Sequence, residues 1–307
     1  MSIRPFVSTI IPNYNHANYL VRRLESVFNQ SYDNFEVIIL DDCSVDNSLE
    51  IIRRYSNNPH LSSIIVNEFN TGSPFIQWKK GIQLAKGDLI WIAESDDYCE
   101  LTFLEEMVNA FLLNEKLSVA FSSYVVFNDE GYLSRGKERS TISFDGTSFV
   151  RGWMSIENAI MNASGAVFKK ELFTSVSGDY LTFRAAGDYQ FWTEIASKGD
   201  VAYVRKNLSY FRVGSNSVTS NSIESGNGLI EDLRICYYIL SHFRLSWFQK
   251  EAMSASFSNK YRCRTVLSAE TLNRMNSLWR FDRRCVFFDS LYLRFISFIR
   301  RHLGLLI

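Results

Sequence analysis

The stretch "LIWIAESDDYCE", Leu89 to Glu100, carries the strongest indication of the fold of this chain. It begins as a run of apolar β-formers, which is typical of a strand buried on both faces of a parallel sheet. It then presents three carboxylates, Glu94, Asp96 and Asp97, within four residues. Like charges this close repel one another unless protons or a cation compensate them. The stretch therefore predicts a buried strand whose carboxyl end carries an acidic cluster with a function.

Strands and helices are expected to alternate around this stretch. Apolar β-forming runs predict strands over residues 6–12, 34–40, 61–66, 88–93, 119–127 and 201–212. Apolar residues at helical spacing predict helices over residues 17–30, 48–55, 75–87, 101–113 and 187–199. Pro12 is expected to end the first strand, Asp46 or Asn47 to cap the second helix, and Gly87 to stop the third. The alternation indicates an α/β fold with a mostly parallel central sheet flanked by helices.

Two acidic clusters fall at the same edge of this sheet. Asp41 and Asp42 follow the second strand, and residues 94–97 follow the fourth. In sheets of this kind, ligands bind outside the carboxyl ends of the strands. The two clusters are therefore expected to face one crevice.

Composition and charge exclude several classes of protein. Lys plus Arg and Asp plus Glu both number 33, so the overall charge does not point to nucleic acid as a partner. The five cysteines are odd in number and contain no C-x-x-C pair, which argues against a disulfide framework and a zinc site. The N-terminus shows no signal-peptide pattern, and no run approaches the roughly 20 apolar residues of a membrane span. These features favour a cytoplasmic protein.

The chain is expected to divide into a first domain over residues 1–220 and a helical region over residues 221–307. Residues 128–146 are expected to be an irregular loop, and the polar, glycine-rich stretch 214–228 marks the boundary or a mobile loop. Residues 283–307 predict an amphipathic, basic, aromatic-rich helix. Its apolar face either docks on the protein, or on a second copy in a homo-oligomer, or lies in a membrane interface. Arginines on and beside it favour an anionic membrane surface: Arg280, Arg283, Arg284, Arg300 and Arg301.

The acidic clusters suit a divalent cation. Carboxylate oxygens are hard ligands that bind Mg²⁺ or Mn²⁺, and such metals commonly complete their shell with substrate phosphates. Solvated turn acids are the alternative for one isolated pair, but a second cluster at an equivalent strand end favours a site. The chain has neither a P-loop nor a G-x-G-x-x-G motif, so a metal would have to carry the charge of a bound diphosphate.

Four motifs, in order, resemble a known family. The stretches "VSTIIPNYN", "VIILDDCSVDNS", "GIQLAKGDLIWIAESDD" and "AGDYQFW" are similar to the successive signatures of family 2 glycosyltransferases over about residues 5–220. These are inverting nucleotide-sugar enzymes with the GT-A fold, which is Rossmann-like. The resemblance implies that fold here and a glycosyltransferase activity that forms a β-linkage.

The resemblance also assigns residues to the donor site. Pro12 and Tyr14 would line the nucleotide pocket, and Asp42 would accept a hydrogen bond from the base, where a carboxylate suits uracil. Asp41 is either a donor-site residue or a turn cap. The remaining donor residues lie on the acidic loop and on a later strand end: Glu94, Ser95, Asp96 and Arg212. Asp96 and Asp97 match the acidic pair that meets the metal and the diphosphate.

Asp188, in "AGDYQFW", matches the catalytic base of the family. Inversion requires a base to remove the proton of the acceptor hydroxyl on the face opposite the leaving diphosphate. Without the family pattern, Asp188 would be interpreted as an N-cap for its helix. Trp192 is expected in the core, with an acceptor-stacking role as the alternative.

The chain departs from the family at Gly214. Many relatives carry a His there that can join the metal shell, so the resemblance implies a changed ligand set in this chain, with either weaker metal dependence or a water in place of the His. Arg212 and residues 215–217 are candidate diphosphate contacts, with a plain flexible loop as the equal alternative. Trp78, Lys79 and Lys80 lie on the helix before the fourth strand and could approach the donor, with solvated lysines as the favoured alternative.

The function expected from the sequence is transfer of one sugar from a nucleotide diphosphate, with UDP favoured, to a saccharide hydroxyl. The resemblance and the C-terminal helix suggest a lipid-linked acceptor of a bacterial surface polysaccharide, and an enzyme at the cytoplasmic face of the inner membrane. Two alternatives remain open: a glycosidase with two carboxylates and no nucleotide, and a non-catalytic partner subunit that binds a nucleotide sugar.

Overall fold

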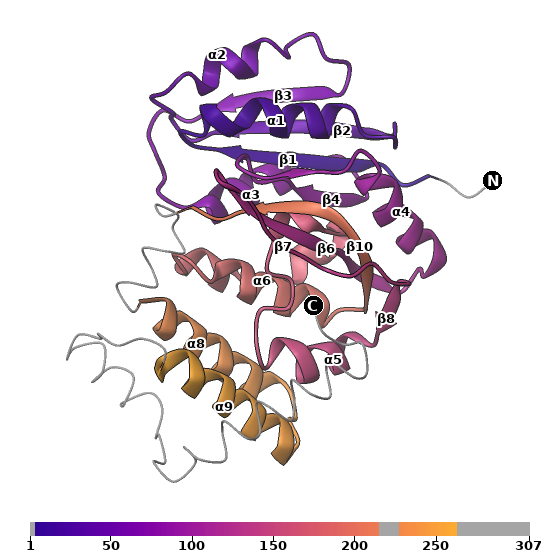
Figure 1. Cartoon of the computed structure of the whole chain (residues 1–307), viewed down its shortest axis with the longest axis vertical. Helices are drawn as coiled ribbons and strands as arrows, with labels where there is room; N and C mark the ends of the chain where they lie inside the picture. The colour runs from indigo at the N-terminus through magenta and orange to yellow at the C-terminus, as the bar shows by residue number, and fades with distance from the viewer. Residues whose placement is uncertain (1–3, 215–226, 263–307) are drawn as a thin grey trace.

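The computed structural model describes residues 4–214 and 227–262, arranged around one sheet (Figure 1). Its strands are β1 (Val7–Asn13), β2 (Phe35–Asp41), β3 (Leu61–Val66), β4 (Leu89–Ile92), β5 (Tyr98–Cys99), β6 (Leu117–Asn128), β7 (Gly131–Arg135), β8 (Ile142–Phe144), β9 (Ala166–Lys169) and β10 (Asp200–Arg212). The main helices are α1 (Ala17–Phe28), α2 (Ser48–Arg53), α3 (Pro74–Leu84), α4 (Phe103–Leu113), α5 (Gly146–Phe149), α6 (Gly187–Ala196), α8 (Asn227–His242) and α9 (Trp247–Arg262). Short 3-10 or π turns lie at η1 (Val150–Met154), η2 (Ala163–Gly165), η3 (Lys170–Ser175) and η4 (Gly178–Thr182).

The strand order is β3-β2-β1-β4-β9-β6-β10-β5. Strands β1 to β4 are parallel, and β1 aligns Val7 with Phe35 of β2 and with Leu89 of β4. Strand β9 is antiparallel to both β4 and β6, so β6 and β10 run in the same direction as the first four strands. This confirms the expected α/β class with a central sheet of mostly parallel strands.

Two apolar cores cover the two faces of the sheet. On one face, α1 and α4 pack against β1, β2 and β4 through a fully buried set: Leu20, Leu24, Val27, Phe103 and Met107. On the other face, α3, α6 and η1 build an aromatic-rich core. Trp192 of α6 is fully buried there, which confirms the expectation that it belongs to the core. Because both faces of the sheet are covered, the sequences of its strands are nearly continuous apolar runs.

Several local expectations were wrong. Strand β1 continues through Pro12 to Asn13. The proline is tolerated because β4 pairs with β1 only as far as Ile10, so that no ladder hydrogen bond to β4 requires an N–H at Pro12. Helix α3 ends at Leu84, before Gly87. A Cβ at Gly87 would lie 2.6 Å from the backbone nitrogen of Ser8, so this glycine permits close contact with β1 instead of stopping a helix.

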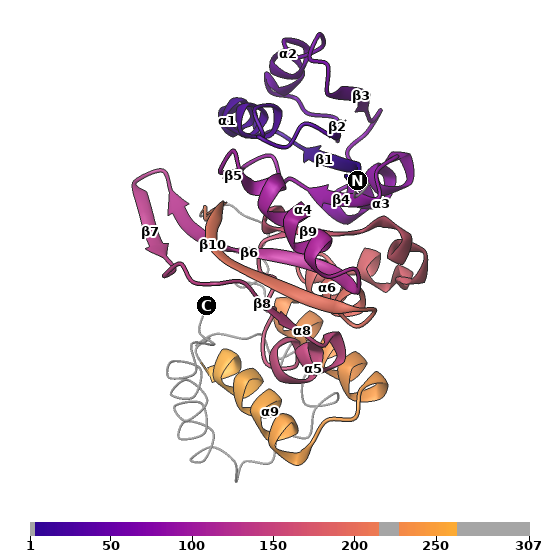
Figure 2. The ribbon, with the colours of Figure 1, turned by 90° about the vertical axis from the view of Figure 1, so that its right-hand side faces the viewer.

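The expected irregular loop at residues 128–146 contains two strands. β7 forms a hairpin with β6, which projects from the body in Figure 2, and β8 pairs with β10. The short strands β5 and β9 were also not predicted from the sequence. Asn47, one of the two expected caps of α2, is its N-cap by position without a side-chain bond, whereas Asp46 accepts the Ser48 N–H at 2.9 Å.

Helices follow residue 226, as expected, over the described residues 227–262. Helix α8 contributes Ile235 and Ile239, both fully buried, to the same core as α3 and α6. The expected boundary at residue 220, the contacts expected of residues 215–217 and the amphipathic helix 283–307 lie outside the described residues. Within residues 4–214 and 227–262, no helix has both the length and the apolar character needed to cross a membrane.

Candidate active site

The expected site residues converge on one edge of the sheet. Figure 1 shows the carboxyl ends of β1, β2, β3 and β10 on the same side of the molecule as the first turn of α6. The loop after β4, which carries residues 94–97, leaves the sheet at this edge next to β1, because β1 pairs with both β2 and β4. The topology therefore gathers both acidic clusters and Asp188 at one edge.

The carboxylate of Asp41 serves the turn after β2. It is fully buried, and its oxygens accept hydrogen bonds from Asn13 Nδ2 and from the Ser44 N–H, both at 2.8 Å. Asn15 and Ser44 link the same two loops through the Asn15 N–H, 2.9 Å from Ser44 Oγ. These are the contacts of a turn cap, the structural alternative for Asp41.

Asp42 organises the loop that precedes α3. Its carboxylate is 4% exposed and accepts hydrogen bonds from Asn67 Nδ2 (2.7 Å), Thr71 Oγ1 (2.8 Å) and Gln77 Nε2 (2.9 Å). The Thr71 N–H adds a further bond at 3.0 Å. A nucleotide base bound by Asp42 would therefore donate to carboxylate oxygens that already accept hydrogen bonds from this loop. Recognition of the nucleotide base by Asp42 stays a prediction.

Pro12 and Tyr14 lie at the end of β1. Pro12 is a buried strand residue, whereas Tyr14 is 43% exposed just beyond the strand. Asn15, which follows, adopts a φ of 55°, in the left-handed region that Asn tolerates better than most residues. Tyr14 is thus exposed directly beyond the end of β1, and its contact with a nucleotide stays a prediction.

Glu94 is held by the aromatic core. Trp78 Nε1 of α3 donates to Glu94 Oε1 at 2.8 Å, so Trp78 shapes the site from within the core. Desolvation, followed by the nearby charge of Asp96, raises the pKa of Glu94 to about 8, although the Trp78 hydrogen bond opposes the shift. Lys80, two residues further on, donates to Asn67 Oδ1 at 2.6 Å.

Asp96 and Asp97 have different surroundings. Asp97 is 3% exposed, and one oxygen accepts the Arg212 N–H of β10 at 2.8 Å. Desolvation first, and then the charge of Asp96, raises the pKa of Asp97 to about 7 against the opposing charge of Arg23. Asp96 is half-buried and forms neither a hydrogen bond nor an ion pair with the residues that the structure describes. Asp96 is therefore the member of the pair that is open to a ligand.

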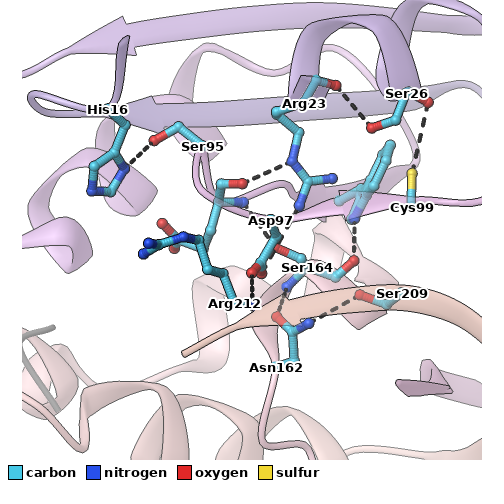
Figure 3. A network of polar contacts seen from close by, with 12 residues as sticks. His16, Arg23, Ser26, Ser95, Asp97, Cys99, Asn162, Ser164, Ser209 and Arg212 are labelled. Carbon is cyan, nitrogen blue, oxygen red and sulfur yellow. Dashed lines mark hydrogen bonds and ion pairs between the residues drawn. The ribbon is translucent and has the colours of Figure 1, made fainter. Parts of the chain in front are cut away.

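A polar network fixes the acidic loop to the rest of the sheet (Figure 3). Ser164 of η2 accepts the Glu94 N–H at its Oγ (3.0 Å) and the Trp91 Nε1–H at its carbonyl (2.8 Å). Asn162 holds Ser164 in turn, and its Nδ2 donates to Ser209 Oγ of β10 at 2.9 Å. The loop is thus pre-organised by bonds to residues far away in the sequence.

Ser95 and His16 close the other side of the loop. His16 Nδ1 lies 2.8 Å from Ser95 Oγ, and Ser95 is 1% exposed. The hydroxyl expected to contact a donor is therefore engaged with the N-terminus of α1.

Arg212 extends toward the β6–β7 hairpin. One guanidinium nitrogen lies 2.8 Å and 3.0 Å from the two carboxylate oxygens of Asp129, and its Cζ lies 3.9 Å from the ring centroid of Tyr19. A Cβ at Gly214 would come within 2.8 Å of another guanidinium nitrogen of Arg212. In this conformation the Arg212 side chain takes space that a side chain at position 214 would need.

Asp188 occupies the first turn of α6. Ala186 is the N-cap, so Asp188 is a first-turn residue and not the N-cap. Asn158 Nδ2 donates to Asp188 Oδ2 at 2.9 Å. Desolvation raises the pKa of Asp188 to about 7, while the Tyr189 N–H and Asn158 oppose the shift and the charge of Asp232 adds to it. A carboxylate with a pKa near neutrality is suited to accept a proton as a general base.

The residues before Asp188 are held by α8. Glu231 is 7% exposed and accepts the N–H groups of Arg184 (2.7 Å), Ala185 (2.9 Å) and Ala186 (2.8 Å). The three residues that carry these N–H groups directly precede the first turn of α6. Glu231 therefore sets the position of the segment that carries Asp188.

The donor set fits a metal that is shared with a ligand. No group of three or more His, Cys, Asp or Glu side chains that could hold a metal ion occurs in residues 4–214 and 227–262. Glu94 and Asp97 are engaged with Trp78 and Arg212, which leaves Asp96. Mg²⁺ is commonly bound by one or two carboxylates with substrate phosphates and water, so one open carboxylate is compatible with a metal brought together with a diphosphate.

Comparison with known proteins decides the family. The sequence pattern of the family described as "Glycosyl transferase family 2" matches residues 8–176, more than half of the chain. The chain belongs to glycosyltransferase family 2. As a family 2 glycosyltransferase it has bacterial relatives whose names state a biosynthetic role or a reaction. TuaG of Bacillus subtilis (strain 168), which its name assigns to teichuronic acid biosynthesis, is 25% identical over 71% of this chain and 83% of its own length.

A second relative of this glycosyltransferase has a defined reaction in its name. WfaP of Escherichia coli, a UDP-Glc:alpha-D-GlcNAc-diphosphoundecaprenol beta-1,3-glucosyltransferase, is 27% identical over 71% of this chain and 81% of WfaP. Among solved structures, S. aureus TarS (residues 1–349) in complex with UDP-GlcNAc superposes with a TM-score of 0.65 at 18% identity. That match covers 89% of this chain and 79% of TarS, and it confirms the GT-A fold.

Several residues that shape the site of this glycosyltransferase were not identified from its sequence. Arg23, Asn158, Asn162 and Glu231 are polar residues outside the four family motifs, and each acts through a partner far away in the sequence. Of these residues, only Arg23 could have been recognised from the sequence pattern, because it lies on the apolar face of α1 with Leu20, Leu24 and Val27. A charge at such a position indicates a buried partner.

Proposed function

We propose that this glycosyltransferase transfers a sugar from a UDP-sugar to a hydroxyl of a lipid-linked saccharide in the synthesis of a bacterial surface polysaccharide such as an O-antigen. The observation that carries the proposal is the pair of carboxylates at one edge of the sheet: Asp96, open beside the end of β4, and Asp188, held by Asn158 with a pKa of about 7. One suits a diphosphate with its metal, and the other suits proton removal. The donor and lipid-linked acceptor in the name of WfaP support the choice of substrates.

The proposed reaction is a single displacement with inversion. Asp188 accepts the proton of the acceptor hydroxyl as the acceptor oxygen forms a bond to the anomeric carbon of the donor. The bond from that carbon to the diphosphate oxygen breaks, and UDP leaves with the bonding electron pair. Attack from the face opposite UDP converts an α-linked donor into a β-linked product.

Donor binding is assigned to the strand ends. Tyr14 would border the base, Asp42 would accept from it, and Arg212 would approach the diphosphate. Asp96 would hold Mg²⁺ or Mn²⁺ together with the diphosphate, and the bound metal would supply positive charge for the leaving group. Asp97 contributes through its buried position beside Asp96.

The proposed place of the reaction is the cytoplasmic face of the inner membrane. An acceptor carried on a lipid requires an enzyme near the bilayer, and the basic amphipathic sequence of residues 283–307 suits an anionic interface. A homo-oligomer that buries the same apolar face stays the alternative.

The proposal is tested first by calorimetric titration of the full chain with UDP, GDP and TDP, with Mn²⁺ and then with EDTA. Selective UDP binding, followed by release of UDP from a UDP-sugar in the presence of a lipid-diphosphate-linked saccharide, is the expected result. The Asp188→Asn variant should bind UDP within about twofold of wild type and lose at least about 10³-fold in turnover.

Two results would contradict the proposal. Retained turnover in Asp188→Asn would remove this residue from the role of base. The absence of binding to all three nucleotides would favour a non-catalytic subunit, or a hydrolase that needs no nucleotide.

A further inference from the structure

Arg23 of α1 is a cation buried directly beneath the acidic loop. Its side chain is 0% exposed and lies among the apolar residues of the helix face that packs on the sheet. Its Nε donates to the carbonyl oxygen of Glu94 at 2.8 Å. A buried arginine is costly unless the structure uses its charge, because an apolar side chain of similar volume would pack at this position without desolvation.

The partner of this charge is Asp97. One terminal nitrogen of Arg23 lies 3.9 Å from Asp97 Oδ2, while neither terminal nitrogen has a hydrogen-bond acceptor among the described residues. Figure 3 shows Asp97 between the guanidinium of Arg23 and the backbone of Arg212. An ion pair built for stability would be close and bidentate. This pair is neither, so its main effect is the electric field that it places under the loop.

Asp97 is thereby engaged from two sides. One oxygen accepts the Arg212 N–H of β10, and the other faces Arg23. Asp96, its neighbour, has no such partner among the described residues. The two adjacent carboxylates therefore have different tasks, although the sequence presents them as an equivalent pair.

We propose that Arg23 is a positioning residue of the donor site, whose buried charge anchors Asp97 and compensates the acidic loop so that Asp96 alone meets the diphosphate and its metal. This inference rests on the proposed function. A donor diphosphate is itself an anion and is repelled by uncompensated carboxylates. With a fixed cation inside the protein, less of that repulsion has to be neutralised by a divalent metal.

The test compares charge removal at two adjacent positions of α1. Arg22 is the matched control: it is exposed on the same helix, and its Cζ lies 3.3 Å from the ring centroid of Tyr98, next to the same loop. We expect Arg23→Met to weaken UDP binding by about tenfold or more in EDTA and by less with saturating Mn²⁺. Arg22→Met should stay within about twofold of wild type in both conditions, and Arg23→Lys, which keeps the charge, should recover part of the loss.

Thermal unfolding distinguishes the two aspartates. Asp97→Asn should lower the Tm by several degrees, because it removes the carboxylate that is ion-paired with the buried Arg23. Asp96→Asn should leave the Tm close to that of wild type and abolish the response of UDP binding to Mn²⁺. In the double variant Arg23→Met/Asp97→Asn, the loss of Tm should be smaller than the sum of the two single losses.

Two outcomes would overturn the inference: wild-type UDP affinity of Arg23→Met both in EDTA and in Mn²⁺, or equal Tm losses in Asp96→Asn and Asp97→Asn. If Arg23→Met does not fold, the double variant replaces it, and full UDP affinity in that variant has the same meaning. If wild type binds none of the nucleotides, the proposed function fails, while the Tm comparison still decides whether Arg23 anchors Asp97.

Discussion

At the scale of single residues, burial gives the carboxylates of the site different pKa values. Asp188 has a pKa raised to about 7 because it is desolvated, and Asn158 donates to its charged form. The pKa of Glu94 is raised further, to about 8, by its burial and by the nearby charge of Asp96. A base accepts a proton only when it is ionised, so the proposed role of Asp188 predicts that the rate of transfer rises with pH through the pKa of Asp188.

The Asn158→Ala variant tests this arrangement. We expect kcat at saturating donor to rise with pH, with its half-maximal value near pH 7 in wild type. Removing the Asn158 donor destabilises the charged carboxylate, so the midpoint should move upward by about one pH unit. The measurement is the pH dependence of kcat, compared with that of the UDP dissociation constant, where the titration of Glu94 should appear. An unchanged kcat midpoint would show that Asn158 does not act on the base.

At the scale of elements, the first turn of α6 is positioned by close packing. Gly187 lies against α3 and η4: a Cβ at this position would lie 2.6 Å from Phe75 Cε2 and 2.6 Å from the carbonyl oxygen of Tyr180. Real Cβ atoms do not tolerate such distances, so a side chain at Gly187 would displace the turn that carries Asp188. The glycine of "AGDYQFW" is thus required by packing.

The Gly187→Ala variant should lose about 1–3 kcal/mol in the free energy of unfolding, because it overpacks this contact. Its kcat should fall more than its UDP affinity, since Asp188 is the adjacent residue. Gly178→Ala is the control, because a Cβ at Gly178 would meet no atom within 4 Å. Denaturant unfolding and steady-state kinetics measure both effects, and equal behaviour of the two variants would contradict the packing argument.

At the scale of the whole molecule, α8 supports the segment that precedes Asp188. Glu231 of α8 accepts three N–H groups from residues 184–186, and Arg234 Nη2 donates to Thr182 Oγ1 at 2.7 Å. Arg234 Cζ also lies 4.0 Å from the ring centroid of Phe183. Because Ile235 and Ile239 share the core of α3 and α6, α8 is a structural part of the transferase body.

We expect Glu231→Gln to lower kcat by about tenfold or more, because an amide cannot accept from all three N–H groups and Asp188 would lose its exact position. Stability should fall by about 1–3 kcal/mol. UDP affinity should change by less than about twofold, since the hydrogen bonds of Glu231 go to residues 184–186 and not to the residues proposed to bind the donor. Glu251→Gln on α9 provides the same chemical change away from this segment. A parallel loss of UDP affinity would indicate general damage to the fold in place of an effect on the base.

Local sequence patterns were sufficient to predict the class of fold and the family, and they assign the proposed site to one edge of the sheet. Alternating apolar runs, the acidic clusters at residues 41–42 and 94–97, and the motif around Asp188 are local patterns, and burial periodicity and strand-end chemistry translate such patterns directly into structure. The three-dimensional structure was needed to show that Asp96 is open while Asp97 is anchored, that Arg23 lies beneath them, and that Glu231 holds the segment before Asp188. It also decided the antiparallel strand β9 and the continuation of β1 through Pro12. These features depend on pairings between residues that are distant along the chain, and a pairing of that kind is set by which surfaces meet when the cores close, which no local pattern specifies.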